Sequence, residues 1–137
     1  GVTTEEDLDD VSIEFGVINQ HIAGTEHRYT YSMIPTKGHF TFDGLTKHDH
    51  RSKSSSKYIF EDHIFISEVS FAPRINSTDE DDGYLVTISN NVQDSTSACL
   101  LFDARNIEQG PICEIPLPHQ ICSGTHATWA QKSEFKS

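Results

Sequence analysis

The chain is poor in basic residues and in long apolar runs, and each shortage excludes a class of protein. Its 137 residues include 10 Lys and Arg against 21 Asp and Glu, which gives a net charge of −11. A surface of this sign repels phosphate backbones, and the few basic residues are scattered, so we predict no nucleic-acid partner. No stretch approaches the roughly 18 consecutive apolar residues that a membrane-spanning helix needs.

Cysteine is also scarce. Cys99, Cys113 and Cys122 form no CxxC pair, and three thiols cannot all be paired within the chain. This favours a reducing compartment, and hence a cytoplasmic location, with each thiol buried as a small apolar residue. The N-terminus is acidic and begins at Gly1, so it carries no readable targeting signal, and we expect the sequence to be a piece of a longer chain.

A helical period is missing as well, whereas short alternating apolar runs separated by turn signals recur about every ten residues. The runs predict strands at residues 11–15, 27–33, 39–42, 57–60, 64–71, 84–89, 98–102 and 112–117. We place the serines of 54–56 at the exposed tip of a hairpin formed by 39–42 and 57–60, and the acidic run 79–82 in a turn that ends at Gly83. This pattern predicts an all-β fold and leaves sandwich, barrel and propeller open.

The segment after the last predicted strand has the features of a site. A Pro-rich corner is followed by Gly124, which would allow a tight bend that aims His126 inward, with Trp129 close behind as a wall. A single histidine after a glycine is weak evidence for a ligand, because most such residues are packed or exposed without binding metal.

Several motifs in order along the chain resemble the carotenoid cleavage oxygenases, a family that includes stilbene-cleaving and retinoid-processing members. The resemblance covers residues 12–130 and rests on Ile13-Glu14-Phe15 with Ile18-Asn19, residues 27–32, 42–49, Phe71-Ala72-Pro73-Arg74, 80–86, 100–105, Ile115-Pro116-Leu117-Pro118-His119 and Gly124-Thr125-His126-Ala127-Thr128-Trp129. Where the family commonly has Pro-Arg after Glu-Phe, this chain has Gly16-Val17.

The resemblance implies a fold and a metal. The family is a seven-bladed β-propeller with ferrous iron, Fe(2+), on its axis, held by four histidines of which three are oriented by glutamates. A blade takes on the order of 40–50 residues, so residues 11–130 would form about the last two blades. By motif match, His126 is the last iron ligand and Glu14 is one of the orienting glutamates. Residues 1–10 are expected to be an acidic loop or frayed end, and 131–137 a polar tail.

The implied activity is that of a nonhaem Fe(II) dioxygenase, which cleaves a conjugated C=C bond to give two carbonyl products. Its partners would be dioxygen and a small apolar polyene or stilbene, that is, a carotenoid, an apocarotenoid or a lignin-derived phenolic. Peripheral membrane contact through segments outside this chain stays open, since nothing in the sequence is an amphipathic anchor.

Two alternatives stand beside this reading. The chain could be a noncatalytic β-rich fragment or a degenerate family member that acts as a binding module, because one histidine and one glutamate cannot hold iron. It could also be a small β-sandwich that binds zinc through His48 and His50, which lie at i and i+2. We place these two on the surface, beside the predicted Ser-rich tip, and interpret His119 as structural.

Overall fold

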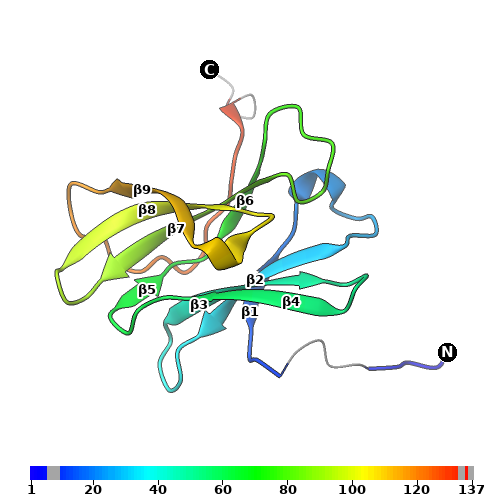
Figure 1. Ribbon diagram of the computed structural model, residues 1–137, viewed down its shortest axis with the longest axis horizontal. Coiled ribbons are helices and arrows are strands. Elements are labelled where there is room, and N and C mark those ends of the chain that lie inside the picture. Colours follow the sequence, from blue (N-terminus) through cyan, green and yellow to red (C-terminus); the bar gives the residue numbers. More distant parts are fainter. Residues whose placement is uncertain (6–9, 133–134, 136–137) are drawn as a thin grey trace.

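A computed structural model describes residues 1–5, 10–132 and 135, and within them the chain is built from β-strands (Figure 1). The elements, in chain order, are β1 (Glu14–Val17), the 3-10 helix η1 (Gln20–Ile22), β2 (Tyr29–Pro35), β3 (Phe42–Asp49), β4 (Ser54–Ile59), β5 (Ile64–Ile66), β6 (Ser70–Pro73), β7 (Gly83–Asn91), β8 (Thr96–Asp103), η2 (Ile107–Gln109) and β9 (Pro111–Pro116). None of the described helices is long and apolar enough to span a membrane. The expectations for 6–9, 133–134 and 136–137 lie outside the described residues.

The strands form two antiparallel groups joined at one point. The N-terminal group runs β1-β2-β3-β4, and in the C-terminal group β5 and β6 both pair with β7, which is followed by β8 and β9. The two groups meet through the single register pair Phe42↔Ile66 between β3 and β5. Figure 1 shows them splayed apart, with β1–β4 on one side and β7–β9 on the other. Each group is a meander of the kind that short antiparallel strands with tight connections favour.

The core lies between the two groups and draws side chains from both. Tyr31 and Met33 of β2 and Leu85 of β7 are buried together with Phe102 of β8. The hydroxyl group of Tyr31 donates a hydrogen bond to the carbonyl oxygen of Ala104 (3.1 Å), so its polar atom is satisfied inside the core. Burial raises the pKa of Tyr31 well above its usual range. The burial of Leu85 and Phe102 shows that the alternating apolar residues that predicted β7 and β8 face this core.

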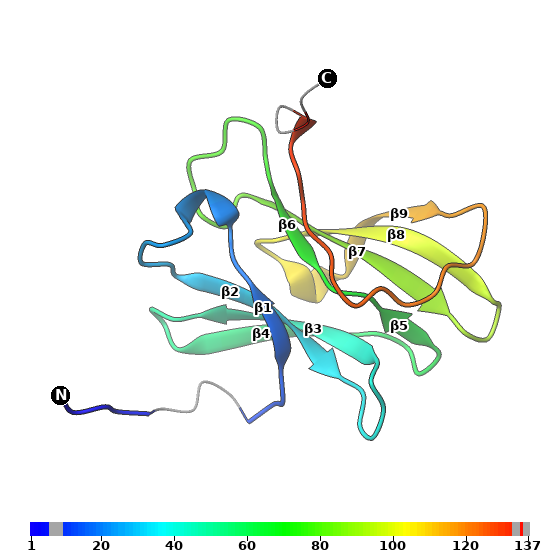
Figure 2. The ribbon, with the colours of Figure 1, turned by 180° about the vertical axis from the view of Figure 1, so that it is seen from behind.

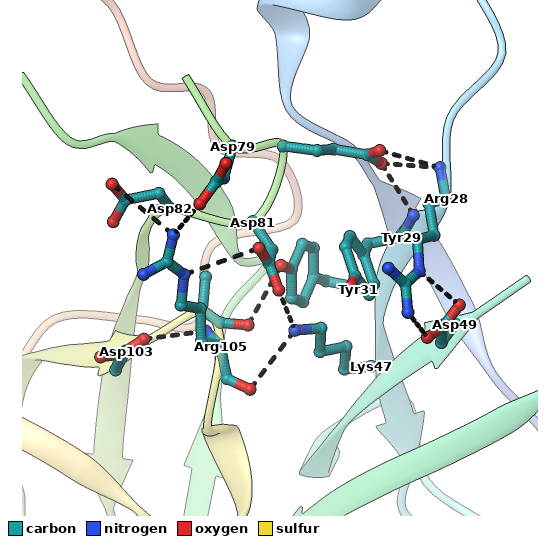
Figure 3. Close-up of polar contacts among 12 residues, drawn as sticks. Arg28, Tyr29, Tyr31, Lys47, Asp49, Asp79, Asp81, Asp82, Asp103 and Arg105 are labelled. Carbon is teal, nitrogen blue, oxygen red and sulfur yellow. Dashed lines mark hydrogen bonds and ion pairs between the residues drawn. The ribbon is translucent and has the colours of Figure 1, made fainter. Parts of the chain in front are cut away.

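The acidic loop, residues 79–82, is the last part of the connection from β6 to β7, and it holds the two groups together (Figure 3). Oδ2 of Asp81 lies 2.8 Å from Nζ of Lys47 on β3, and both side chains are largely buried, with exposed fractions of 16% and 8%. Arg105, just after β8, lies 2.6 Å from Asp79 and 3.6 Å from Asp81. The loop thus places carboxylates between a cation of one group and a cation of the other.

The same loop fixes the start of β2. The carboxylate of Glu80 accepts the backbone N–H groups of Arg28 and Tyr29, each at 2.8 Å. The Arg28 guanidinium in turn makes a two-pronged contact with Asp49 at the end of β3, and it holds the pKa of that carboxyl well below its usual range. The turn predicted from the sequence at 79–82 is confirmed. The contacts that this turn makes with β2, β3 and Arg105 were not predicted.

Several local predictions are wrong. The serines of 54–56 are in β4, paired with residues 47–49 of β3, and the hairpin tip lies at 50–53. Asp49 stabilises that tip, because its Oδ1 accepts the backbone N–H groups of Arg51 and Ser52. The predicted strand 64–71 is broken into β5 and β6, with Ser67, Glu68 and Val69 between them. Serine is a frequent turn residue, and its run concealed a strand partner of β3.

The cysteines and one histidine also differ from expectation. All three thiols are free, but Cys113 and Cys122 are exposed and Cys99 is partly buried. His48 is buried, 4% exposed, in β3. The surface interpretation of His48 is therefore wrong, because His48 lies in an inner strand that pairs with β2 along one edge and with β4 along the other.

Candidate metal centre

His126 lies on a C-terminal segment, residues 117–131, that contains no helix or strand. The segment leaves β9 and runs back across β5 and β6 towards β1 (Figure 2). Its backbone is held by side chains of the strand group it crosses: the N–H of Gly124 donates to Oγ of Ser67 at 3.0 Å. A bend lies at Thr125, but Gly124 does not adopt a positive φ there. The prediction that the bend aims His126 inward is wrong, because the His126 side chain is 72% exposed. Hydrogen bonds to the sheet, not a glycine turn, set the path of this segment.

A carboxylate that sequence reasoning did not single out faces His126. Oε2 of Glu68 lies 3.3 Å from Nδ1 of His126, and it accepts the backbone N–H of Ala127 at 2.5 Å. The Glu68 side chain is 11% exposed, whereas that of His126 is 72% exposed. A carboxylate at Nδ1 favours the tautomer that carries its proton there, which leaves the lone pair of Nε2 free to bind a metal ion.

The sequence around Glu68 contains a signal that marks it as a candidate functional residue. It is the one charged residue in the run of 64–72, and it interrupts the strand at the β5–β6 junction. A carboxylate in an otherwise apolar stretch is costly to bury without a partner, so such a residue is a candidate for a functional contact. Periodicity alone could not supply the partner, which lies far along the chain.

A shallow hollow of about 240 Å³ lies beside the pair. Its wall includes Glu68, Val86, Ile121, His126 and Trp129, so polar and apolar groups share it. Trp129 is 48% exposed and lines this hollow together with His126, in keeping with its predicted place near the imidazole.

Glu14 is placed differently. It is exposed at the start of β1, opposite Met33 of β2. The contact between its strand and the C-terminal segment is made by the next residue, because the ring of Phe15 meets the His126 ring edge-to-face at a centroid distance of 5.3 Å. The structure therefore brings the Glu14 strand to His126 through Phe15.

The histidines of the zinc alternative do not converge with this segment. The His50 ring packs edge-to-face on His27 at 5.4 Å, and its Nε2 lies 2.7 Å from Oγ1 of Thr30. Burial, and then the nearby His27 and His48, lower the pKa of His50. Among residues 1–5, 10–132 and 135, no group of three or more His, Cys, Asp or Glu side chains could hold a metal ion.

Comparison with known proteins agrees with the motifs. The family model described as retinal pigment epithelial membrane protein matches residues 1–131. A carotenoid cleavage oxygenase of Mycobacterium tuberculosis is 30% identical over 136 residues, which is 95% of this chain and 27% of that protein. A lignostilbene-α,β-dioxygenase isozyme III of Sphingomonas paucimobilis is 30% identical over 96 residues, covering 70% of this chain and 20% of the relative.

Solved structures show the same architecture. The cobalt-substituted apocarotenoid oxygenase of Synechocystis matches with a TM-score of 0.83 at 27% identity, over 91% of this chain and 26% of that one. Pseudomonas brassicacearum lignostilbene dioxygenase matches with a TM-score of 0.82 at 22% identity, over 90% of this chain and 28% of the other, which supports the fold alone. The prediction of an all-β chain that forms about two blades of a seven-bladed β-propeller is confirmed, as a partial and open arrangement.

The chain spans about a quarter of the length of the curated relatives it matches, 19% to 28%. Its strands form an N-terminal group, β1–β4, and a C-terminal group, β5–β9, and His126 contacts Phe15 of the first and Glu68 of the second. The family match covers nearly all of these residues. The chain therefore belongs to the retinal pigment epithelial membrane protein family, the family of the carotenoid cleavage oxygenases.

Proposed function

We propose that this chain is the part of a nonhaem Fe(II) dioxygenase that supplies one iron ligand, His126, and the carboxylate that orients it, Glu68. The observation that carries the proposal is the contact of 3.3 Å between Glu68 Oε2 and His126 Nδ1. The reaction is cleavage of a conjugated C=C bond by dioxygen, with one oxygen atom entering each of two carbonyl products. The relatives named as carotenoid, apocarotenoid and lignostilbene oxygenases support this reaction class.

The donor chemistry of the segment fits ferrous iron. Neutral imidazole is a good ligand for this ion, and a carboxylate at the other ring nitrogen fixes the ring and raises its basicity. Cobalt substitution in the Synechocystis relative is in keeping with a metal in this family. When bound, ferrous iron supplies the activation of dioxygen beside the alkene.

The residues of this chain have separate tasks in this proposal. Glu68 lies 3.3 Å from Nδ1 of His126 and accepts the N–H of Ala127, so one largely buried carboxylate orders both the ring and the backbone that carries it. Glu14 would orient a histidine outside this chain, because it is exposed on β1 and the described contact of β1 with His126 is made by Phe15. The hollow lined by Val86, Ile121 and Trp129 gives apolar surface beside the imidazole for part of a polyene or stilbene.

The remaining ligands would come from outside this chain, since no three donors converge among the residues that the structure describes. We therefore expect the 137-residue chain on its own to be inactive and to bind no iron tightly. The activity belongs to the full-length protein.

The test is a His126→Ala variant of the full-length protein, with iron measured by elemental analysis and cleavage followed by the carbonyl products of a carotenoid and a stilbene. His119→Ala is the matched control, because His119 is an exposed histidine of the same segment. We expect His126→Ala to lose iron and both activities while His119→Ala keeps them. Retention of iron and activity by His126→Ala would contradict the proposal.

A further inference from the structure

Phe15 has a backbone conformation that its side chain disfavours. Its φ is 51°, in the left-handed region that bulky residues rarely adopt. It lies in β1 between the pairs Glu14↔Met33 and Val17↔Tyr31, where the register with β2 shifts. Strained residues of this kind persist where the surrounding structure holds them, and they gather at functional sites.

The ring of Phe15 contacts both the core and His126. It meets Phe42 edge-to-face, with centroids 5.6 Å apart and rings at 80°. It also meets the imidazole of His126 edge-to-face, at 5.3 Å and 85°. Phe42 is itself buried, 4% exposed, so the Phe15 ring rests on a fixed support.

His126 depends on such contacts because its own segment provides no regular structure. Its side chain is 72% exposed, and its backbone belongs to a stretch without strand or helix. Glu68 restrains one ring nitrogen, but a contact at one atom leaves rotation of the ring about that direction free. A second contact on the ring itself, at nearly a right angle, removes that freedom.

We propose that Phe15 is a positioning residue for the metal-binding imidazole: its strained backbone holds the aromatic ring against His126, which together with Glu68 sets the direction of Nε2. This inference rests on the proposed function, in which His126 binds the metal. The cost of the unfavourable φ is then explained by the placement of the ring.

The experiment is a titration of the metal-free full-length protein with cobalt(II), whose visible absorption bands respond to the geometry of its ligands. The variants are Phe15→Leu and His126→Ala. Phe40→Leu is the matched control, because Phe40 contacts the same Phe42 ring, at 5.9 Å, and is 75% exposed. Thermal unfolding of each variant shows whether it is folded.

We expect Phe15→Leu to bind cobalt(II) about 2- to 12-fold more weakly, which is the range for one aromatic contact, and to shift the visible bands. Phe40→Leu should match the wild type in both. If Phe15→Leu does not fold, Phe15→Gly replaces it: glycine adopts a positive φ without strain and removes the ring, so the same weakening and shift are expected.

The two ways of failing are distinct. Wild-type affinity and bands in a folded Phe15 variant, with cobalt(II) binding lost in His126→Ala, would overturn the role of Phe15 and leave the proposed function intact. Unchanged cobalt(II) binding in His126→Ala would overturn the ligand assignment, and the role of Phe15 with it.

Discussion

The largely buried carboxylate of Glu68, at the junction of β5 and β6, lies 3.3 Å from Nδ1 of the exposed His126 on the C-terminal segment. The same carboxylate oxygen accepts the N–H of the residue after His126. A break in the strand pattern of one blade thus determines where a residue near the end of the chain presents its imidazole.

Replacing Glu68 by Gln should weaken metal binding without removing a ligand. An amide keeps the shape but loses the negative charge that faces Nδ1 of His126, and changes of this kind cost about 10- to 100-fold in metal affinity. Glu61→Gln is the control, because Glu61 is an exposed glutamate 3.5 Å from His63 and has no part in the proposed site. Competition for iron against a chelator measures the difference, and equal affinities in the two variants would contradict the role of Glu68.

The buried pair of Lys47 and Asp81 should be costly to break from one side. Lys47→Met leaves the Asp81 carboxylate largely buried, with Arg105 at 3.6 Å as its remaining cation. Loss of one partner of a buried pair costs about 3–5 kcal/mol, and we expect the lower end because Arg105 stays. Adding Asp81→Asn should recover part of the loss in urea unfolding. A double variant as unstable as the sum of both singles would show that the unpaired charge is not the cause.

The Arg28–Asp49 pair predicts a pH dependence. Because the folded protein lowers the pKa of Asp49 below the value of about 3.9 in unfolded chains, the folded state binds fewer protons than the unfolded state as the pH falls below about 4. The stabilisation is therefore present at neutral pH and is lost as the pH falls through that range. Asp49→Asn should be less stable than the wild type at pH 7, with a gap that narrows towards pH 3. Arg28→Met should behave alike, and a gap independent of pH in thermal unfolding would contradict this account.

The aromatic cluster between the blades should be sensitive to a cavity. Phe102 of β8 is fully buried and meets Tyr58 and Phe60 edge-to-face, at 5.4 and 6.0 Å. Phe102→Ala should cost about 3–5 kcal/mol in unfolding free energy, since surrounding side chains cannot fill the space. Phe40→Ala, at an exposed position, should change stability by no more than about 0.5 kcal/mol. Similar losses in both variants would mean that the cluster does not determine stability.

The parts of the fold that sequence predicts well are those where one face of a strand is buried. The alternation in 84–89 and 98–102 predicted the β7–β8 hairpin because inward and outward residues take turns there. Prediction from alternation failed at β4, where Ser54 and Ser55 are exposed strand residues. It also failed at β5–β6, where Glu68 interrupts the predicted strand 64–71. Exposed strands and breaks depend on their neighbours in space, which local pattern does not contain.

Some residues of the candidate site could also be predicted from the sequence, and others could not. The motif resemblance picks out His126 and Glu14, and their roles stay predictions. Glu68 and Phe15 become candidates through contacts between distant segments, and the unusual φ of Phe15 has no signature in its side chain type. The position of Glu68 in a mostly apolar run is a signal that the sequence contains. The contact between the rings of Phe15 and His126 is visible only in the structure.

The place of β9 at the end of the sheet order has a practical consequence. β9 pairs with β8 on one side, and its other edge has no partner among the residues that the structure describes. The strand also carries two exposed apolar side chains, Ile112 and Ile115, which are 57% and 50% exposed. A free edge of this kind invites strand addition between molecules, so the chain produced alone should self-associate as its concentration rises. Solution work on the isolated chain should therefore begin with its association state.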